Sequence, residues 1–501
     1  MLLFTLFTIF FLAAANVPYS SSSSLEVPTS VGNVIGIIDQ ITPDVKQWLG
    51  IPFAEPPLGP LRFLPPTKPK NSSGVILAQS AAASCQQYLK GVPNIFNLVP
   101  EFNPPKPYSE DCLYLNIVAP RNPKHKRLPV AVWVHGGEYT YGGINTPYEK
   151  PQKWVQRSQE HIVVQISYRL NLLGFPNAPG LNQSELNLGI LDIRFAVEWV
   201  RDNIASFGGD PLKIVLWGQA AGGGLVDAYQ YANVDDPIAR GIIQESSVIT
   251  LGDLHTDVNQ TTWKWVADQF NCTGDAKQVL DCMRNVDAVM LETLLQTHTD
   301  SGASPTLYLG AVADNTTAFT RAQYMQMAAA KSIPKLPTLV GSTANEGANF
   351  VPYSADGTTT TEAAIRTATL SIFQCRVARE TAARTEGGGK TWRYYYAGNF
   401  TNISPKPWMG AYHFAEIPLI TGTHADYRGN STSFESALSE TMQEYWLAFI
   451  KDPMHGLTQT GWPEYIGSNG TVIVFGEDDE LIQMRGGAVL DEGLAVVNCT
   501  V

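Results

Sequence analysis

The chain is short of cationic residues. Among its 501 residues, 34 Lys and Arg stand against 46 Asp and Glu, which gives a formal net charge of −12. A surface of that sign repels nucleic acid and anionic membranes, so we expect neither as a partner. Hydrophobic residues make up 44% of the chain and charged residues 16%, a composition typical of a globular protein with a large core.

Signatures of metal and cofactor sites are also absent from the sequence. The eight His residues are scattered, and neither a His-Glu-x-x-His nor a clustered Cys-x-x-Cys motif occurs. The run Gly222-Gly223-Gly224 lacks the Gly-x-Gly-x-x-Gly spacing of a dinucleotide-binding turn. We therefore expect no metal and no cofactor.

The N-terminus has no basic residue before Lys46, yet it has the apolar core of an export signal. Residues 2–15 are apolar except for two threonines, end in three alanines and are too short to span a bilayer. We interpret residues 1–19 as a signal peptide, with a buried N-terminal strand as the less favoured alternative. No transmembrane segment is expected.

Two further features fit an oxidising, extracellular compartment. The six cysteines are an even number, although the count alone leaves their pairing open. Glycosylation sequons are dense, and they begin at Asn71, Asn182, Asn259, Asn271, Asn315, Asn399, Asn402, Asn430, Asn469 and Asn498. The C-terminus carries neither a retention tetrapeptide nor an anchor tail. The sequence thus predicts a secreted glycoprotein.

Short apolar runs alternate with helical patterns along the chain. The runs 130–134 and 162–167 are typical of buried central strands, and residues 188–204 repeat apolar positions at helical spacing. Such alternation predicts an α/β fold with a mostly parallel sheet and helices on both faces. No repeat or composition shift divides the chain, so we expect a flexible serine-rich lead-in over 20–27 and one domain over 28–501.

One turn lacks the residue that would make it reactive. The apolar run Ile214–Trp217 leads into Gly218-Gln219-Ala220-Ala221-Gly222, a pattern that predicts a strand, a tight turn and a helix. In such a nucleophile elbow, small neighbours make room for a strained turn that lifts its central side chain above the sheet. Here the central residue is alanine, and no Gly-x-Ser-x-Gly occurs elsewhere in the chain.

Four specific motifs occur along the chain in a fixed order. They are Gly50–Pro57 with Leu61–Phe63, Glu110–Asn116, Asn187–Asp192 and Phe207–Pro211. With them the chain resembles the type-B carboxylesterase/lipase family, the cholinesterase-like branch of the α/β-hydrolases, from about residue 28 to the C-terminus. The resemblance implies an α/β-hydrolase fold with helical cap insertions, which residues 250–330 could form. It also implies hydrolysis of a small-molecule carboxylic ester through an acyl-enzyme.

The resemblance assigns the catalytic positions one by one. Ala220 takes the place of the serine nucleophile, Glu346 matches the acid that orients the histidine, and His413 matches the general base. The order nucleophile, acid, histidine along the chain is that of α/β-hydrolases. Without the family, His413 would stand little above the other seven histidines.

The resemblance also places an oxyanion hole in the segment Val134–Tyr139. The expected donors are the backbone amides of Gly137, Glu138 and Ala221. The family usually has a small residue where this chain has Glu138. A carboxylate there would oppose a developing oxyanion unless it points away or is paired.

A further departure follows the next expected strand, in Gln244-Glu245-Ser246-Ser247, where the family commonly has Gln-Ser-Gly. Ser246 or Ser247 could lie near the pocket, and ordinary loop hydroxyls are favoured over a substitute nucleophile because neither lies in an elbow.

For the cysteines, the resemblance implies the disulfides Cys85–Cys112 and Cys272–Cys282. This leaves Cys375 and Cys499, which form a third pair or are free or intermolecular.

Three interpretations of the alanine remain. The chain is an ester hydrolase whose serine was replaced to trap a bound ester, which the retained Glu346 and His413 favour. Alternatively it is a natural member that uses His413 and the oxyanion hole for non-hydrolytic biosynthetic chemistry, which Glu138 and Glu245 favour. The third is a binding or adhesion protein, for which decay of the whole triad would be expected. Under each, ester hydrolysis by the chain as written is expected to be close to background, with slow direct attack by water as the residual route.

Overall fold

The computed structural model describes residues 25–70, 74–247, 257–353, 361–467 and 469–499. The expected signal peptide and the first sequon therefore lie outside the described residues. The end of the lead-in expected over 20–27 forms part of a strand. Glu26 and Val27 belong to strand β1 and pair with Ile35 and Val34, because Val27 packs into the core.

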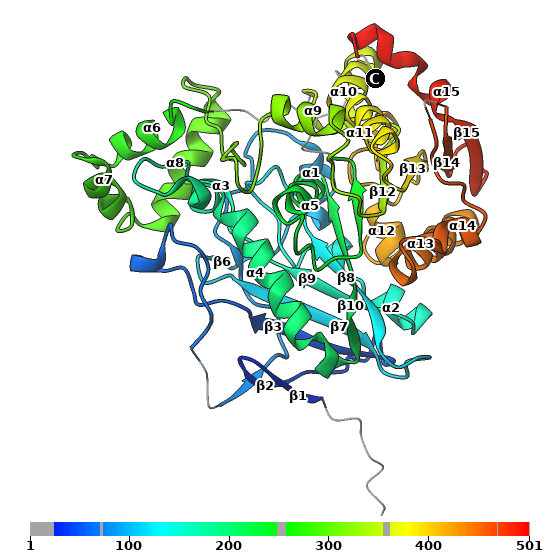
Figure 1. Ribbon diagram of the computed structural model, residues 1–501, viewed down its shortest axis with the longest axis horizontal. Coiled ribbons are helices and arrows are strands. Elements are labelled where there is room, and N and C mark those ends of the chain that lie inside the picture. Colours follow the sequence, from blue (N-terminus) through cyan, green and yellow to red (C-terminus); the bar gives the residue numbers. More distant parts are fainter. Residues whose placement is uncertain (1–24, 71–73, 248–256, 354–360, 468, 500–501) are drawn as a thin grey trace, which may run out of the picture.

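A ten-stranded sheet forms the centre of the molecule, in the order β15-β14-β13-β12-β11-β10-β8-β9-β7-β3 (Figure 1). The strands from β14 to β9 run parallel, whereas β15, β7 and β3 join antiparallel at the two edges. Their bounds are β3 Val45–Pro52, β7 Tyr114–Pro120, β8 Leu128–Val134, β9 Ile162–Ile166, β10 Gly209–Gln219, β11 Gly241–Glu245, β12 Thr338–Thr343, β13 Thr391–Tyr396, β14 Thr471–Phe475 and β15 Ile482–Gly486. The expected α/β fold is confirmed.

Helices cover both faces of this sheet. On one face lie α4, α5 and α11, and on the other α2, α12 and α13. The longer helices are α2 Gln152–Ser158, α4 Leu188–Asn203, α5 Ala221–Ala232, α6 Thr261–Gln269, α7 Ala276–Met283, α8 Ala288–Ser301, α9 Arg321–Ala329, α10 Glu362–Ala368, α11 Cys375–Glu386 and α13 Ser433–Lys451. Shorter elements are β1 Glu26–Thr29, β2 Gly32–Ile35, β4 Val75–Leu77, β5 Ser84–Cys85, β6 Tyr108–Ser109, α1 Ile95–Leu98, α3 Asn171–Gly174, α12 Ile417–Thr421, α14 Gly456–Gln459 and α15 Gly487–Asp491.

Strand β8 shows why the sheet needs helices on both sides. All seven of its residues are buried. Val130 and Val132 belong to the core beneath α4 and α5, while Ala131 and Trp133 belong to the core that holds Trp446 of α13. Because successive side chains of a strand point to opposite faces, a continuous apolar run requires cover on both.

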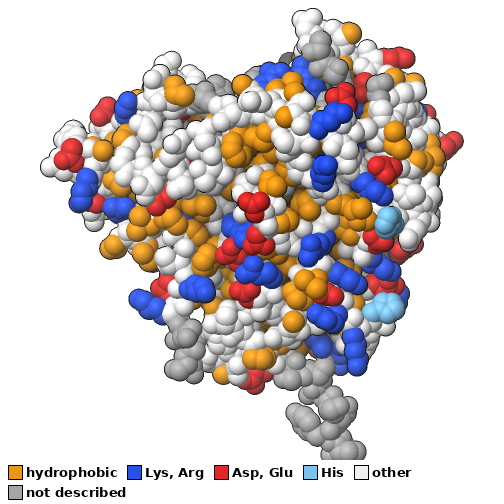
Figure 2. Space-filling view, in the orientation of Figure 1, with side chains coloured by type: hydrophobic (Ala, Val, Ile, Leu, Met, Phe, Trp, Pro, Cys, Tyr) orange, Lys and Arg blue, Asp and Glu red, His pale blue; other side chains and the backbone are white. Residues whose placement is uncertain are grey.

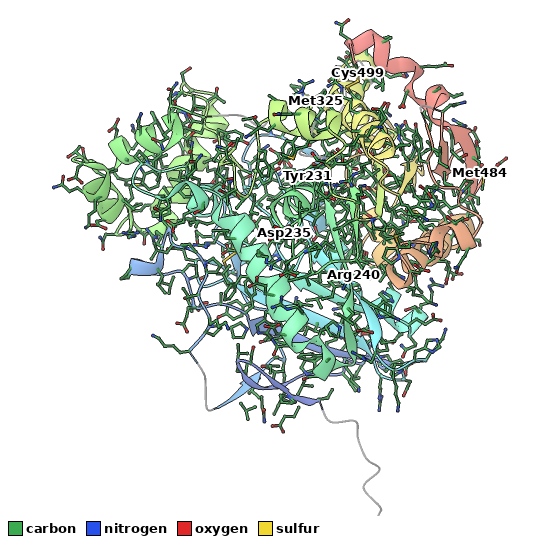
Figure 3. The ribbon with its side chains drawn as sticks, in the orientation of Figure 1. Tyr231, Asp235, Arg240, Met325, Met484 and Cys499 are labelled. Atoms are coloured by element: carbon green, nitrogen blue, oxygen red, sulfur yellow. A yellow bond between two sulfur atoms is a disulfide. The ribbon has the colours of Figure 1, made fainter. Side chains whose placement is uncertain are left out.

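Both disulfides implied by the resemblance are present, and the two cysteines left open, Cys375 and Cys499, form a third. Cys85–Cys112 joins β5 to the start of β7, Cys272–Cys282 ties the end of α6 to α7, and Cys375–Cys499 ties α11 to the C-terminal segment. Figure 3 shows Cys499 at the end of that segment, beside α10 and α11. In Figure 1 the helices α6, α7 and α8 lie together at the left, beside the sheet.

Candidate active site

Ala220 occupies a sharp turn between β10 and α5. Its backbone has φ 48° and ψ −123°, a conformation that residues other than glycine rarely adopt. The Ala220 amide donates to the Glu245 carbonyl at 2.8 Å. A Cβ on Gly222 would lie 2.1 Å from the Val134 carbonyl oxygen, so only glycine fits at that point. The backbone of a nucleophile elbow is thus present with a methyl group where a hydroxyl would be.

His413 and Glu346 lie close together at this end of the sheet. His413 Nδ1 is 2.5 Å from Glu346 Oε2, and both side chains are buried. The other carboxylate oxygen accepts the amide of Thr343 at 2.7 Å. With Glu346 accepting at Nδ1, a neutral ring carries its proton there and has Nε2 free to accept one. This is the state that a general base requires.

Asn345 holds the two loops together. Its amide donates to the Ala411 carbonyl at 2.9 Å, and its side chain donates to the carbonyls of Trp408 and Met409 at 2.8 and 2.7 Å. The loop after β12, which carries Glu346, is therefore fixed against the segment that carries His413.

Gln219 is a site residue that sequence reasoning passed over. Its Nε2 lies 3.5 Å from His413 Nε2, and its Oε1 is buried without a partner among the described residues. The sequence does contain a signal for this residue, because Gln219 is a polar residue at the end of an otherwise apolar run. The side-chain amide of Gln219 is the polar group that His413 Nε2 meets next to the methyl of Ala220.

The segment after β8 presents free backbone amides. Gly137 and Glu138 have φ values of 109° and 55°, and the carbonyl of Gly137 accepts the amides of Thr140 and Tyr141. Ala221 is the first residue of α5, where a helix leaves its amides unpaired. Within the described part of the chain, the amides of Gly137, Glu138 and Ala221 have no acceptor. They are available to bind a negatively charged oxygen.

The carboxylate of Glu138 is paired. Its Oε2 lies 2.7 Å from Lys90 Nζ, and both side chains are partly exposed at the pocket. The cation of Lys90 offsets the negative charge that would otherwise oppose an oxyanion. Glu138 is thus paired, which is one of the two circumstances in which its carboxylate would not oppose an oxyanion.

A pocket of about 60 Å³ lies over Ala220. Ala220, His413, Gly137 and Glu138 line it, and further walls come from residues 89–97 and from the aromatic residues Tyr141, Phe350 and Phe414. Among the residues that the structure describes, none that lines the pocket comes from the stretch expected as a cap. Instead α8 supports the wall indirectly, because Gln296 donates to the Leu89 carbonyl at 2.9 Å.

Neither Ser246 nor Ser247 is among the described residues that line the pocket. Ser246 is fully buried and donates to Glu416 Oε1 at 3.4 Å. Glu245 is also fully buried, and Trp446 Nε1 donates to its Oε1 at 2.7 Å. The elements around Ser246 hold it behind the turn rather than in the pocket.

Replacing Glu245 by glutamine is expected to make stability less sensitive to pH. Burial raises the pKa of Glu245 from 4.5 to about 8. The folded chain therefore holds this proton more tightly than the unfolded chain, so its stability is full below pH 4.5 and falls as the pH rises towards 8. We expect Glu245→Gln to melt at a higher temperature than the parent at pH 8 and at the same temperature at pH 4.5.

The matched control is Glu362→Gln at an exposed position of α10, which should leave both melting temperatures unchanged. A shift of equal size at both pH values for Glu245→Gln would contradict the assignment.

Within residues 25–70, 74–247, 257–353, 361–467 and 469–499, no group of His, Cys, Asp and Glu side chains has the arrangement of a metal site. No helix in those ranges has the length and apolar content that crossing a membrane requires.

The chain is similar to known proteins over most of its length. Residues 23–368 and 353–487 match the Carboxylesterase family. The chain is 42% identical over 480 residues to Secreted lipase 5 of Gibberella zeae, covering 90% of each protein. It is 40% identical over 494 residues to Chlorogenic acid esterase of Aspergillus niger, covering 94% of each. Pyrethroid hydrolase Ces2e of Rattus norvegicus is 37% identical over 243 residues, 48% of this chain and 42% of that protein. With the sheet and the helices described above, these matches show that the chain belongs to the carboxylesterase family.

Proposed function

We propose that this protein is secreted, holds a carboxylic ester in the pocket over Ala220 and hydrolyses it at or near the background rate. The observation that carries the proposal is the elbow conformation of Ala220 together with the 2.5 Å contact between His413 and Glu346. The base and its orienting acid are assembled, and the attacking oxygen atom is absent.

The proposed pocket would orient an ester as follows. The carbonyl oxygen faces the amides of Gly137, Glu138 and Ala221, and the carbonyl carbon lies over position 220. In a serine hydrolase a hydroxyl at that position attacks the carbon while histidine accepts the proton. Removing a serine nucleophile costs roughly 10⁶ in rate, and about 10³ to 10⁴ over water remains from the oxyanion hole and binding. His413 could support that residual rate by accepting a proton from water.

Several observations support the substrate class and the location. Two relatives that match along nearly their whole length are named a secreted lipase and an esterase. Phe96, Phe350 and Phe414 give the pocket apolar walls, which suit an acyl chain or an aromatic acyl group. Three disulfides are typical of an oxidising compartment.

Non-hydrolytic chemistry at His413 is a second candidate. Two residues favour it: the carboxylate of Glu138 lies at the pocket beside the amides expected to bind an oxyanion, and Gln219 Nε2 lies 3.5 Å from His413 Nε2. In that case the pocket would bind an apolar substrate, and His413 would move a proton without forming an acyl-enzyme.

The test of the proposal is covalent labelling combined with ligand binding. A fluorophosphonate reagent should leave the mass of the chain unchanged, since no activated hydroxyl is present. Short and medium acyl p-nitrophenyl esters should raise the melting temperature in proportion to occupancy, whereas p-nitrophenol with the free acid should raise it much less. A phosphonate adduct would overturn the claim of inactivity, and a full ester panel without any shift would overturn the claim of an ester pocket.

A further inference from the structure

A second hollow lies at the other end of the sheet from Ala220. It has a volume of about 630 Å³, and its walls come from β3, the connection between β7 and β8, and residues 206–208 before β10. These segments lie at the start of β8 and β10, whereas the pocket over Ala220 lies beyond their ends. Strand β8 has seven residues, so roughly 23 Å of strand separates the two hollows.

The hollow is lined by cations. The connection Arg121–Arg127 reads Arg-Asn-Pro-Lys-His-Lys-Arg, and all seven residues are exposed. Lys46 projects from β3 into the same hollow, and the lining residues include no Asp or Glu within the described ranges. Lys and Arg side chains gather on the lower right of the face drawn in Figure 2. We call this hollow the basic groove.

Two of the four Lys and Arg side chains that line the groove lie near a carboxylate. Lys124 pairs with Glu160 at 2.7 Å, and Arg127 lies 3.6 Å from Asp210. Lys46, His125 and Lys126 have no acidic partner in the described part of the chain. Partial burial and then the nearby Arg121 lower the pKa of Lys46. Like charges therefore crowd one groove of a chain whose net charge is −12.

We propose that the basic groove binds an acidic polysaccharide. Net charge argues against anionic partners for the molecule as a whole, but charges act mainly within a Debye length of about 8–10 Å. A local cluster of cations therefore attracts a ligand that approaches along the groove. Basic runs of this length are typical of polyanion-binding sites.

The groove suits a sugar chain better than a nucleic acid or a membrane. Its aromatic residues, Trp48 and Phe207, are buried, so they offer no face on which bases could stack. No large hydrophobic side chain of the groove is exposed, so nothing there could insert into a bilayer. The exposed ring of Pro123 adds an apolar surface beside the cations, which matches the apolar faces of sugar rings.

The test measures binding of the full chain to polygalacturonate and to dextran sulfate at low ionic strength, with neutral dextran as reference. The variant Lys46→Gln/Lys126→Gln removes two groove cations. The control Lys277→Gln/Lys331→Gln makes the same change in net charge at exposed positions on α7 and after α9. Each cation near an anionic surface contributes about fivefold in affinity, so the groove variant, which lacks two, should bind about 25-fold more weakly.

Binding that rises as salt falls and is lost in the groove variant alone supports the proposal, and the probe that binds shows whether carboxylate or sulfate is preferred. Equal losses in both variants, no binding to either probe, or binding only to anionic vesicles or nucleic acid overturns it. An unchanged melting temperature in each variant shows that the fold is intact. Because the groove is remote from Ala220, the outcome is independent of the proposed ester pocket.

Discussion

Replacing Ala220 by serine is expected to raise the hydrolysis rate of p-nitrophenyl butyrate by about 10⁴- to 10⁶-fold. The turn already has the backbone of an elbow, with φ 48° and ψ −123°. A hydroxyl added to the Cβ would enter the pocket that His413 also lines. Glu346 already holds the imidazole in the tautomer that accepts a proton at Nε2. The substitution supplies an attacking oxygen atom next to His413 and Glu346. Steady-state kinetics of the parent chain and of the Ala220→Ser variant measure the effect.

Two variants isolate the cause of such a gain. Ala220→Gly relaxes the backbone without adding a hydroxyl, so its rate should stay at the background value. Adding His413→Ala to the serine variant should remove most of the gain, because serine then has no base. A gain below about tenfold in a correctly folded serine variant would mean that Gln219 or Glu138 has changed the site, and non-hydrolytic chemistry would become the favoured function.

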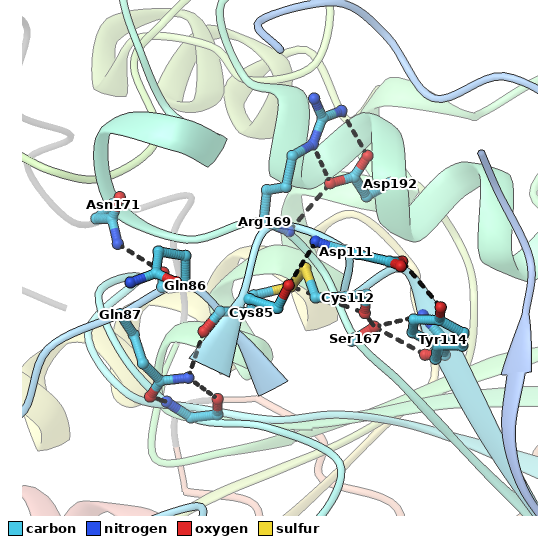
Figure 4. Close-up of a disulfide and its surroundings, with 12 residues drawn as sticks. Cys85, Gln86, Gln87, Asp111, Cys112, Tyr114, Ser167, Arg169, Asn171 and Asp192 are labelled. Atoms are coloured by element: carbon cyan, nitrogen blue, oxygen red, sulfur yellow. Dashed lines mark hydrogen bonds and ion pairs between the residues drawn. A yellow bond between two sulfur atoms is a disulfide. The ribbon is translucent and has the colours of Figure 1, made fainter. Parts of the chain in front are cut away.

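Replacing Asp192 by alanine is expected to lower the free energy of unfolding by about 3–5 kcal/mol. Arg169 Nε and Nη2 donate to the two oxygens of Asp192 at 2.8 and 2.7 Å, and both side chains are almost fully buried. The Arg169 amide donates to the same carboxylate at 3.0 Å (Figure 4). Without Asp192, the Arg169 guanidinium would stay buried without its carboxylate partner. Of the contacts named here, it would keep only the hydrogen bond to the Leu64 carbonyl.

Urea denaturation under conditions that keep the disulfides intact measures this loss. The control is Asp202→Ala, which removes a surface carboxylate beside Arg201 and should leave the midpoint almost unchanged. If both variants lost the same small amount of stability, the ion pair between Arg169, which follows β9, and Asp192 of α4 would not be an important contact. A variant that fails to fold at all would agree with the expectation, since the loss is a large part of a typical total stability.

The sequence predicted the elements around the site well because their patterns are local. The apolar run of β8 requires cover on both faces, and the small residues around Ala220 are compatible with one kind of turn. Glu346 and His413 were a different case. They are distant in the chain from Ala220, and local sequence patterns do not predict contacts between distant residues. Their expected roles came from the resemblance to the family, and the contact between them is seen only in the structure.

The pocket walls could not be predicted because they depend on contacts between distant loops. Leu89 and Lys90 reach the pocket through support from α8 and an ion pair with Glu138. The described part of the stretch expected as a cap, residues 257–330, contributes no residue to the lining. Helical periodicity predicts that a helix forms, but it does not specify which neighbour the apolar face covers.

The strained turn at position 220 has a genetic consequence. A backbone held at positive φ by a non-glycine residue costs about 1–3 kcal/mol and persists only when the surrounding structure enforces it. That enforcement comes from many residues, including Gly222 and the strand partners of β10, and it would take many mutations to rebuild once lost. The missing hydroxyl is different, because any alanine codon becomes a serine codon through one base substitution. The chain therefore lies one base substitution from a serine at position 220, in a turn whose backbone already has the conformation of a nucleophile elbow.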